Sequence, residues 1–238
     1  YAFPTFSGNT IESNGRRAIA VGGTIEASES TSETWPKVQD LPYWVIQDNV
    51  QIKSNVTLSV AAGTVVKFQY TGNDDKKRRF LVEGTLDLKG TDSDPVVFTS
   101  SRDDEYGGDT NGDGEVTEPS SGDWGYIKFT SQPNVTNVFE HAVVRYGGER
   151  DNACCGNDSN DDYMVWVTSP EEGYEDVTIR DVTIENSHFA GIHVDNASPT
   201  IKNNTIRETG DAIELAGNFE RPAKPSIENN TIEDNRRH

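Results

Sequence analysis

One motif recurs along the last third of the chain. Three successive segments carry it, and in them Ile184, Ile206 and Ile232 occupy equivalent positions, spaced by 22 and 26 residues. A related segment, Phe139–Gly148, fits the same frame 40 residues earlier. Periods of about 20 to 50 residues indicate a solenoid or a tandem array. The three segments are "VTIRDVTIENSHFAGIHVDNAS" (Val177–Ser198), "PTIKNNTIRETGDAIELAG" (Pro199–Gly217) and "PSIENNTIEDNRRH" (Pro225–His238).

The pattern within each repeat is that of short β-strands. Apolar residues alternate over a few positions at a time, as at Val182 and Ile184 or at Ile192 and Val194, and no segment carries the 3.6-residue stripe of a helix. A repeat of about 22 residues accommodates three such strands, and stacked coils then lie ~4.8 Å apart. We therefore predict an all-β fold, a parallel β-helix (solenoid) with 22–26 residues in each coil.

Asparagine recurs on both sides of the shared isoleucine. Asn tolerates the left-handed backbone that sharp turns need. Stacked Asn side chains also hydrogen-bond along a solenoid. We expect both roles here, at Asn9, Asn204 and Asn230, two residues before the isoleucine, and at Asn14, Asn186 and Asn235, just after it with one residue of slack.

The chain is predicted to form a single β-helix domain, interrupted by polar stretches. The expected parts are an N-terminal coil (1–25), a Ser/Glu-rich connection (26–42), and the main solenoid (43–238) with insertions at 101–123 and 149–162.

The order of motifs in the middle of the chain resembles that of right-handed parallel β-helix domains of microbial surface and secreted proteins, which share the broad pectate-lyase-like architecture. The motifs run from "GTVVKF" and "VEGTLDLKGTDSDPVVFTS" through "GGDTNGDG" and "GDWGYIKF" to "AVVRYGG". The likeness covers Tyr43–Gly148 in ordered motifs and the rest as generic coils. It implies a right-handed coil but no particular activity, because that architecture hosts lyases, hydrolases, adhesins and fibres.

The insertion "DTNGDGEVTEPSSGDW" carries the strongest chemical signal. Asp109, Asn111 and Asp113 alternate and Gly114 holds the sixth place, as at the start of a D-x-[DN]-x-[DN]-G calcium loop. The twelfth position is Ser120 rather than Glu, so a closing carboxylate must come from elsewhere. The predicted cofactor is Ca²⁺, and the alternative is a solvated acidic hairpin. Glu115 would add a backbone carbonyl, and the nearby carboxylates are Asp123, Glu118, Asp104 and Asp103.

Two features of the 149–162 insertion carry weaker signals. Asp158, Asn160 and Asp162 alternate in the same way, but Tyr163 stands where the glycine should be, which favours a solvated loop over a second metal site. Cys154 and Cys155 are adjacent, so a strained ring, an interchain bridge and free thiols all remain open.

The net charge and the glycosylation motifs limit the partners and the cellular location that we expect for the protein. The net charge of −19 disfavours nucleic acid as a partner, because a polyanion would be repelled. No run of about 18 apolar residues is present, so we expect no transmembrane segment. We expect an extracellular or cell-surface location, where glycosylation becomes relevant at the Asn-x-Ser/Thr sites Asn55, Asn134, Asn157, Asn196, Asn203 and Asn229.

No catalytic motif stands out, so no catalytic residue is predicted. His193 and Asp195 share one strand face and His141 follows Glu140, but plentiful carboxylates make such pairs uninformative. His193 is expected to be a polar, outward residue. The tryptophans, which stack on sugars in a glycan-binding protein, are expected mostly to pack or to anchor loops; they are Trp35, Trp44, Trp124 and Trp166.

The two ends of the chain favour a structural role. Pro4–Arg17 and the last repeat agree at seven of fourteen positions, and neither looks like the cap that a solenoid usually carries. Pro199–Ala212 agrees with the last repeat at six of fourteen, so the echo alone does not establish a tandem duplication. We expect a non-catalytic, calcium-stabilised surface module that associates end-to-end into a fibre or belongs to a longer protein. The alternative is a carbohydrate-binding or polysaccharide-degrading, lyase-like protein, with surface glycans as partners.

Overall fold

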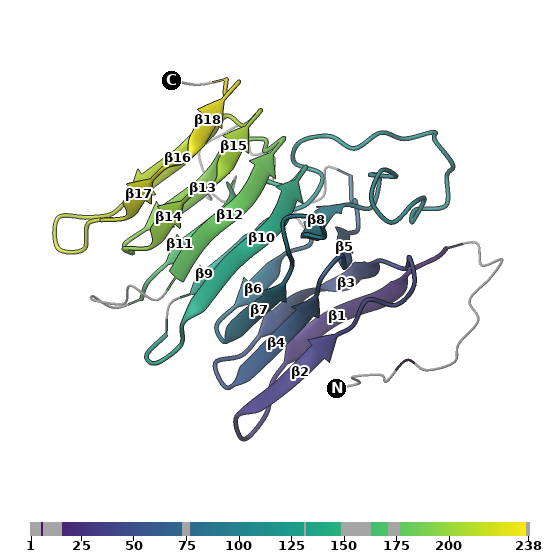
Figure 1. Cartoon of the computed structure of the whole chain (residues 1–238), viewed down its shortest axis with the longest axis horizontal. Coiled ribbons are helices and arrows are strands. Elements are labelled where there is room, and N and C mark those ends of the chain that lie inside the picture. The colour runs from purple at the N-terminus through teal and green to yellow at the C-terminus, as the bar shows by residue number, and fades with distance from the viewer. Residues whose placement is uncertain are drawn as a thin grey trace.

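The structure is a computed structural model that describes residue 6 and residues 16–72, 77–130, 132–148, 163–170 and 177–236. All eighteen elements within these ranges are β-strands, and no helix there is long and apolar enough to cross a membrane. They stack in order along the molecule, from β1 and β2 at one end to β17 and β18 at the other (Figure 1). The strands are β1 (Ile19–Ile25), β2 (Thr31–Trp35), β3 (Tyr43–Ile52), β4 (Val56–Ala61), β5 (Val65–Phe68), β6 (Phe80–Val82), β7 (Thr85–Lys89), β8 (Val96–Ser100), β9 (Ile127–Thr130), β10 (Asn137–Arg145), β11 (Tyr163–Thr168), β12 (Val177–Glu185), β13 (Ala190–Asp195), β14 (Thr200–Lys202), β15 (Thr205–Arg207), β16 (Asp211–Ala216), β17 (Ser226–Glu228) and β18 (Thr231–Glu233).

The strands pair in parallel between successive coils. Fifteen of them form one curled sheet, and β2, β4 and β7 form a second sheet. The large sheet curls because long strands belong to two rows of neighbours. In β3, Tyr43–Val45 pair with β5 and Val50–Ile52 pair with β6. In the same way, β12 pairs first with β14 and then with β15. The predicted all-β solenoid of parallel strands is confirmed.

A single column of inward side chains runs the length of the solenoid and forms much of its core. The register places Ile184, Ile206 and Ile232 directly in line, which confirms their predicted equivalence. The same column continues backwards through aromatic and β-branched residues whose side chains are buried at every level. These residues are Tyr43, Val66, Phe98 and Val144.

The corners between strands use left-handed backbone, as predicted, although partly at neighbouring residues. At the first corner the positive φ belongs to Asn203 (55°) and Asn229 (52°), one residue before the predicted Asn204 and Asn230. At the second corner Asn186 (59°) fits the prediction, whereas Asp234 (54°) takes the place expected of Asn235. Two adjacent residues therefore divide the two predicted roles at the first corner. Asn203 and Asn229 adopt the left-handed backbone, and the residues after them, Asn204 and Asn230, form the hydrogen bonds between coils.

Asn204 and Asn230 form the predicted ladder. The Oδ1 atom of Asn230 accepts hydrogen bonds from the backbone N–H of Asn204 at 2.9 Å and from its Nδ2 at 3.0 Å. Asn204 itself is 1% exposed, and its amide bonds to Ile179 O at 3.0 Å and to Val182 N–H at 3.1 Å. The side chain thus replaces backbone pairing where the chain turns the corner, as buried polar groups require.

The domain scheme needs one correction. Residues 26–42 are not a plain connection, because they contain β2, which pairs with β4 over five successive residues. The alternating burial of β2 ends at Trp35, whose ring stacks on Tyr43 at 4.7 Å. The exposed positions of β2 are Ser32 and Thr34, whereas Thr31, Glu33 and Trp35 pair with the buried residues of β4. Most of the predicted first coil, and the 149–162 insertion with its cysteines and second acidic motif, lie outside the described residues.

Candidate functional site: the acidic loop

Residues 101–123, here called the acidic loop, contain no strand and lie beside β5 and β8 (teal in Figure 1). Lys67 of β5 fastens the first half of this loop. Its side chain faces outward from the sheet but is fully buried, and Nζ donates hydrogen bonds to Asp103 O at 2.8 Å and to Gly108 O at 2.5 Å. A lysine in the apolar run "VVKF" therefore anchors a loop that begins three strands later, after β8.

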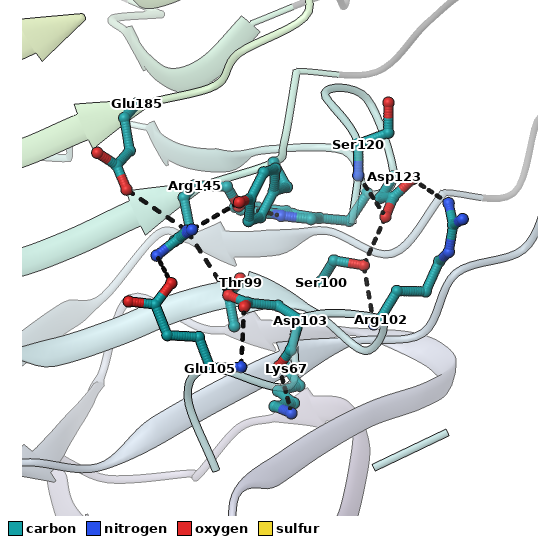
Figure 2. A network of polar contacts seen from close by, with 12 residues as sticks. Lys67, Thr99, Ser100, Arg102, Asp103, Glu105, Ser120, Asp123, Arg145 and Glu185 are labelled. Carbon is teal, nitrogen blue, oxygen red and sulfur yellow. Dashed lines mark hydrogen bonds and ion pairs between the residues drawn. The ribbon is translucent and has the colours of Figure 1, made fainter. Parts of the chain in front are cut away.

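Asp123 closes the loop and is bound away from its acidic centre. Its Oδ2 accepts hydrogen bonds from Ser100 Oγ at 2.7 Å and from Ser120 N–H at 3.2 Å, and its Oδ1 contacts Arg102 Nη1 at 3.2 Å (Figure 2). Burial raises the pKa of Asp123, against the opposing effects of Ser100, Ser120 and Arg102. Both carboxylate oxygens of Asp123 are thus occupied by contacts that hold the end of the loop against β8. Asp123 does not belong to the group of carboxylates that lie close together in the loop.

Arg145, at the end of β10, ties the loop to the following coils. Its guanidinium lies 2.8 Å from Glu105, 3.6 Å from Asp103 and 3.4 Å from Glu185 of β12 (Figure 2). The Asp103 carboxylate also accepts a hydrogen bond from Thr99 Oγ1 at 2.5 Å. Asp103 and Glu105 are therefore held in ion pairs with Arg145. The acidic residues from Asp109 to Glu118 form the outer part of the loop.

The outer part of the acidic loop is wound around Asp109. Its Oδ1 accepts the backbone N–H of Gly112 at 2.7 Å and of Asp113 at 3.2 Å, and its Oδ2 accepts that of Gly114 at 2.8 Å. Gly112 and Gly114 have φ of 79° and 69°, which glycine adopts without strain. Burial acts to raise the pKa of Asp109, but these three backbone hydrogen bonds, with help from Lys67, outweigh it and lower that pKa.

Three carboxylates meet in this outer part. Asp104, Asp109 and Asp113, here called the carboxylate cluster, have oxygen atoms within 4.8 Å of one another. Asp104 Oδ1 and Asp113 Oδ1 are inaccessible to solvent and have no hydrogen-bond partner. An unsatisfied buried oxygen costs about 1–3 kcal/mol, and more when it carries charge. The cluster therefore presents two lone, shielded oxygens of the hard type that Ca²⁺ prefers.

Repulsion between the neighbouring carboxylates further disfavours the charged form of Asp104. Burial raises the pKa of Asp104, and the carboxylates of Asp109, Asp113 and Asp103 raise it further, against the lowering effect of Lys67. A cation placed among the oxygens would reverse this repulsion. The arrangement of the three carboxylates could therefore hold a cation.

The structure brings together only part of the predicted ligand set. Asn111 lies beside the cluster but uses Nδ2 to bond Asp113 Oδ2 and Thr117 Oγ1, both at 3.0 Å, so it orients Asp113. Glu115 was predicted to contribute its backbone carbonyl, which stays a prediction, and its exposed side chain does not belong to the cluster. Lys67 and Arg145 were missed, although a charged residue inside an apolar strand next to an acidic insertion is a usable signal.

A second group, on the corner between β10 and β12, also brings ligand atoms within 4.8 Å of one another; it consists of Glu140, His141 and Asp181. Here two of the three side chains already have an ion-pair contact. Arg180 contacts Glu140, and His141 Nδ1 lies 2.8 Å from Asp92. We therefore read this group as a set of ion pairs along the solenoid surface.

The remaining predicted surface residues are mostly covered. His193 was predicted to be a polar, outward residue. Its side chain does point away from the core, but it is only 4% exposed because neighbouring side chains cover it. Its ring stacks on Tyr163 at 3.7 Å and its Nδ1 lies 3.1 Å from Glu214. Trp35, Trp44 and Trp124 are buried, which favours packing over sugar stacking for these three rings.

Lys67 makes the stability of the protein depend on pH. Burial lowers the pKa of Lys67 to about 8, and Asp103, Asp104 and Asp109 offset only part of that effect. An unfolded lysine titrates near ~10.4. Between these values the unfolded chain binds more protons than the folded chain, so stability rises with pH there. The neutral amine keeps two N–H groups, enough for both carbonyl bonds.

We expect the free energy of unfolding in urea to rise by about 2 kcal/mol between about pH 7.5 and about pH 9.5 because of Lys67 alone. The variant Lys67→Met should lose this component and show a flatter profile over the same interval. Identical pH profiles for the two proteins would contradict the assigned role of Lys67.

Comparison with known proteins agrees with this architecture. Residues 166–238 match the family described as the right handed beta helix region. The parallel solenoid and this match together define the protein as a right-handed parallel β-helix. None of the curated proteins and none of the solved structures compared gives a significant match.

Proposed function

We propose that the protein is a non-catalytic structural module of an extracellular or cell-surface assembly, in which Ca²⁺ holds the acidic loop against the solenoid. The observation that carries this proposal is the carboxylate cluster, with two shielded oxygens that lack any donor. Asp104, Asp109 and Asp113 would ligate the ion through carboxylate oxygens. With few charged ligands the affinity is expected to be low, in the range of about 10⁻⁴–10⁻³ M found in extracellular modules.

The last described coil supports a role in assembly. Ile227 and Ile232 continue the columns of Ile201 and Ile206, which are fully buried, yet they are 45% and 52% exposed. β17 and β18 also have paired neighbours on one side only among the described strands. Apolar side chains beside free strand edges are the surface that another β-coil covers. In this proposal the coil comes from a second copy or from a longer surface protein.

The assembly proposal predicts self-association of the chain on its own. We expect negative-stain microscopy and sedimentation at high protein concentration in Ca²⁺ to show end-to-end oligomers or fibres. Ile232→Lys should abolish them, because the column would then end on a charge. Val116→Lys replaces another exposed apolar residue (81%), on the acidic loop, and should leave assembly unchanged. A wild-type chain that stays monomeric under these conditions contradicts the proposal that a second copy covers the last coil.

A further inference from the structure

A pocket of about 220 Å³ opens between the acidic loop, Trp44 of β3 and the residues that follow β5. Its walls combine two arginines, two aromatic residues and the inner edge of the loop. Of the carboxylate cluster only Asp113 reaches it, so this pocket is separate from the centre of the cluster. The lining side chains are those of Arg16, Trp44, Tyr70, Arg102, Asn111 and Asp113, with Gln69, Ser101 and Thr117 completing the wall.

The aromatic rings of the pocket are covered by cations. The guanidinium of Arg16 lies 5.2 Å from the centre of the Trp44 ring, and that of Arg102 lies 4.6 Å from the centre of the Tyr70 ring. A guanidinium therefore covers one face of the Trp44 ring and one face of the Tyr70 ring, so these faces are not open for stacking against a neutral sugar. What the pocket presents instead is positive charge, held in place by cation–π contacts.

Two residues of the pocket wall, Trp44 and Arg102, also carry buried N–H groups that lack an acceptor. Trp44 is 7% exposed, and its Nε1 is buried without a hydrogen-bond partner. The Nε of Arg102 is likewise buried and unpartnered, although its Nη1 contacts Asp123. Buried donors of this kind are rare in folded proteins, and a bound oxygen atom satisfies them. An anionic oxygen does so best, because hydrogen bonds to guanidinium are strengthened by charge.

We propose that this pocket binds the oxyanion group of a small ligand, a carboxylate or a sulfate, through Trp44, Arg102 and Arg16. Binding extends beyond the structural function proposed above and does not require it. One refinement does rest on that function: Asp113 repels an anion, and a cation on the carboxylate cluster removes this repulsion. We therefore expect the oxyanion to bind more tightly in Ca²⁺ than in EDTA.

The indole N–H signals of the four tryptophans provide a direct readout by nuclear magnetic resonance. The probes are glucuronate, sulfate and, as a neutral molecule of similar shape, glucose. We expect the Trp44 signal, assigned with Trp44→Phe, to shift in a saturable way with glucuronate, with sulfate or with both, and not with glucose. The choice between the two anions identifies the source of the oxyanion. The Trp124 indole, which donates to Arg145 O at 2.9 Å, serves as an internal reference.

Arg16→Gln removes one guanidinium and should weaken anion binding about tenfold. Arg17→Gln removes the same charge from the next residue, which does not line this pocket, and should leave the affinity within about twofold. An unmoved Trp44 signal with both anions, an equal shift with glucose, or equal losses in the two arginine variants would overturn the proposal. Equal affinity in Ca²⁺ and EDTA would remove only the coupling to the carboxylate cluster, with the pocket itself supported.

Discussion

Replacement of Asn204 by leucine should lower the free energy of unfolding by about 3 kcal/mol or more. The leucine side chain fills a similar volume, but it leaves the carbonyl of Ile179 and the N–H of Val182 without the partners that the amide supplies. Each unsatisfied buried backbone group costs about 1–3 kcal/mol. The bond from Nδ2 to Asn230 in the next coil is lost as well, whereas the backbone N–H at position 204 can still donate to Asn230. Urea unfolding followed by far-ultraviolet circular dichroism measures the change.

The neighbouring position provides a matched control. Asn203 is exposed and has φ of 55°, a conformation that glycine adopts freely. Asn203→Gly should therefore change stability by less than about 1 kcal/mol. A small effect of Asn204→Leu, similar to that of the control, would mean that the ladder of asparagines does not hold the corner.

The second large effect concerns Asp104 and should change sign with calcium. In saturating Ca²⁺, Asp104→Asn removes a charged ligand, and the loss approaches the full linkage energy, about 2.7 kcal/mol at a hundredfold excess over the dissociation constant. In EDTA the same substitution removes repulsion from Asp109 and Asp113, so the variant should be as stable as the wild type or slightly more stable. Thermal unfolding in the two buffers gives both values.

Glu115→Gln is the control for this experiment, because it removes one negative charge from the same loop outside the carboxylate cluster. It should behave alike in Ca²⁺ and EDTA, apart from a small general charge effect. If Asp104→Asn lowers stability equally in both buffers, the carboxylate acts in the fold alone and the proposed metal role fails.

The repeat pattern predicted the solenoid well because a β-helix is periodic. One inward residue for each coil, at Ile184, Ile206 and Ile232, sets the register of neighbouring strands, so local alternation and one period specify most of the architecture. The strand at 31–35 was missed because its first four residues, Thr-Ser-Glu-Thr, are all polar, and only its last residue, Trp35, is buried. The polar composition of β2 is that of a loop, so the sequence carried little sign of a strand there.

The candidate site was predicted less completely, since loop geometry depends on partners far away in the sequence. The motif spacing placed Asp109 and Asp113 together, and of the nearby carboxylates proposed to close the site the structure brings Asp104 to them. Asp123 was an equally good candidate by sequence, but Ser100 and Arg102 hold it elsewhere. Lys67 decides the position of the loop through two backbone carbonyls, and a sequence does not display which carbonyls a lysine will reach.

The most direct test of a calcium-held acidic loop is a calorimetric titration of Ca²⁺ into the metal-free protein, with Asp104→Asn in parallel. We predict one saturable site in the wild type, with a dissociation constant of about 10⁻⁴–10⁻³ M or tighter. In Asp104→Asn the affinity should fall at least about tenfold. Absence of a saturable site in the wild type, or an unchanged affinity in the variant, would contradict the assignment of the carboxylate cluster as a calcium site.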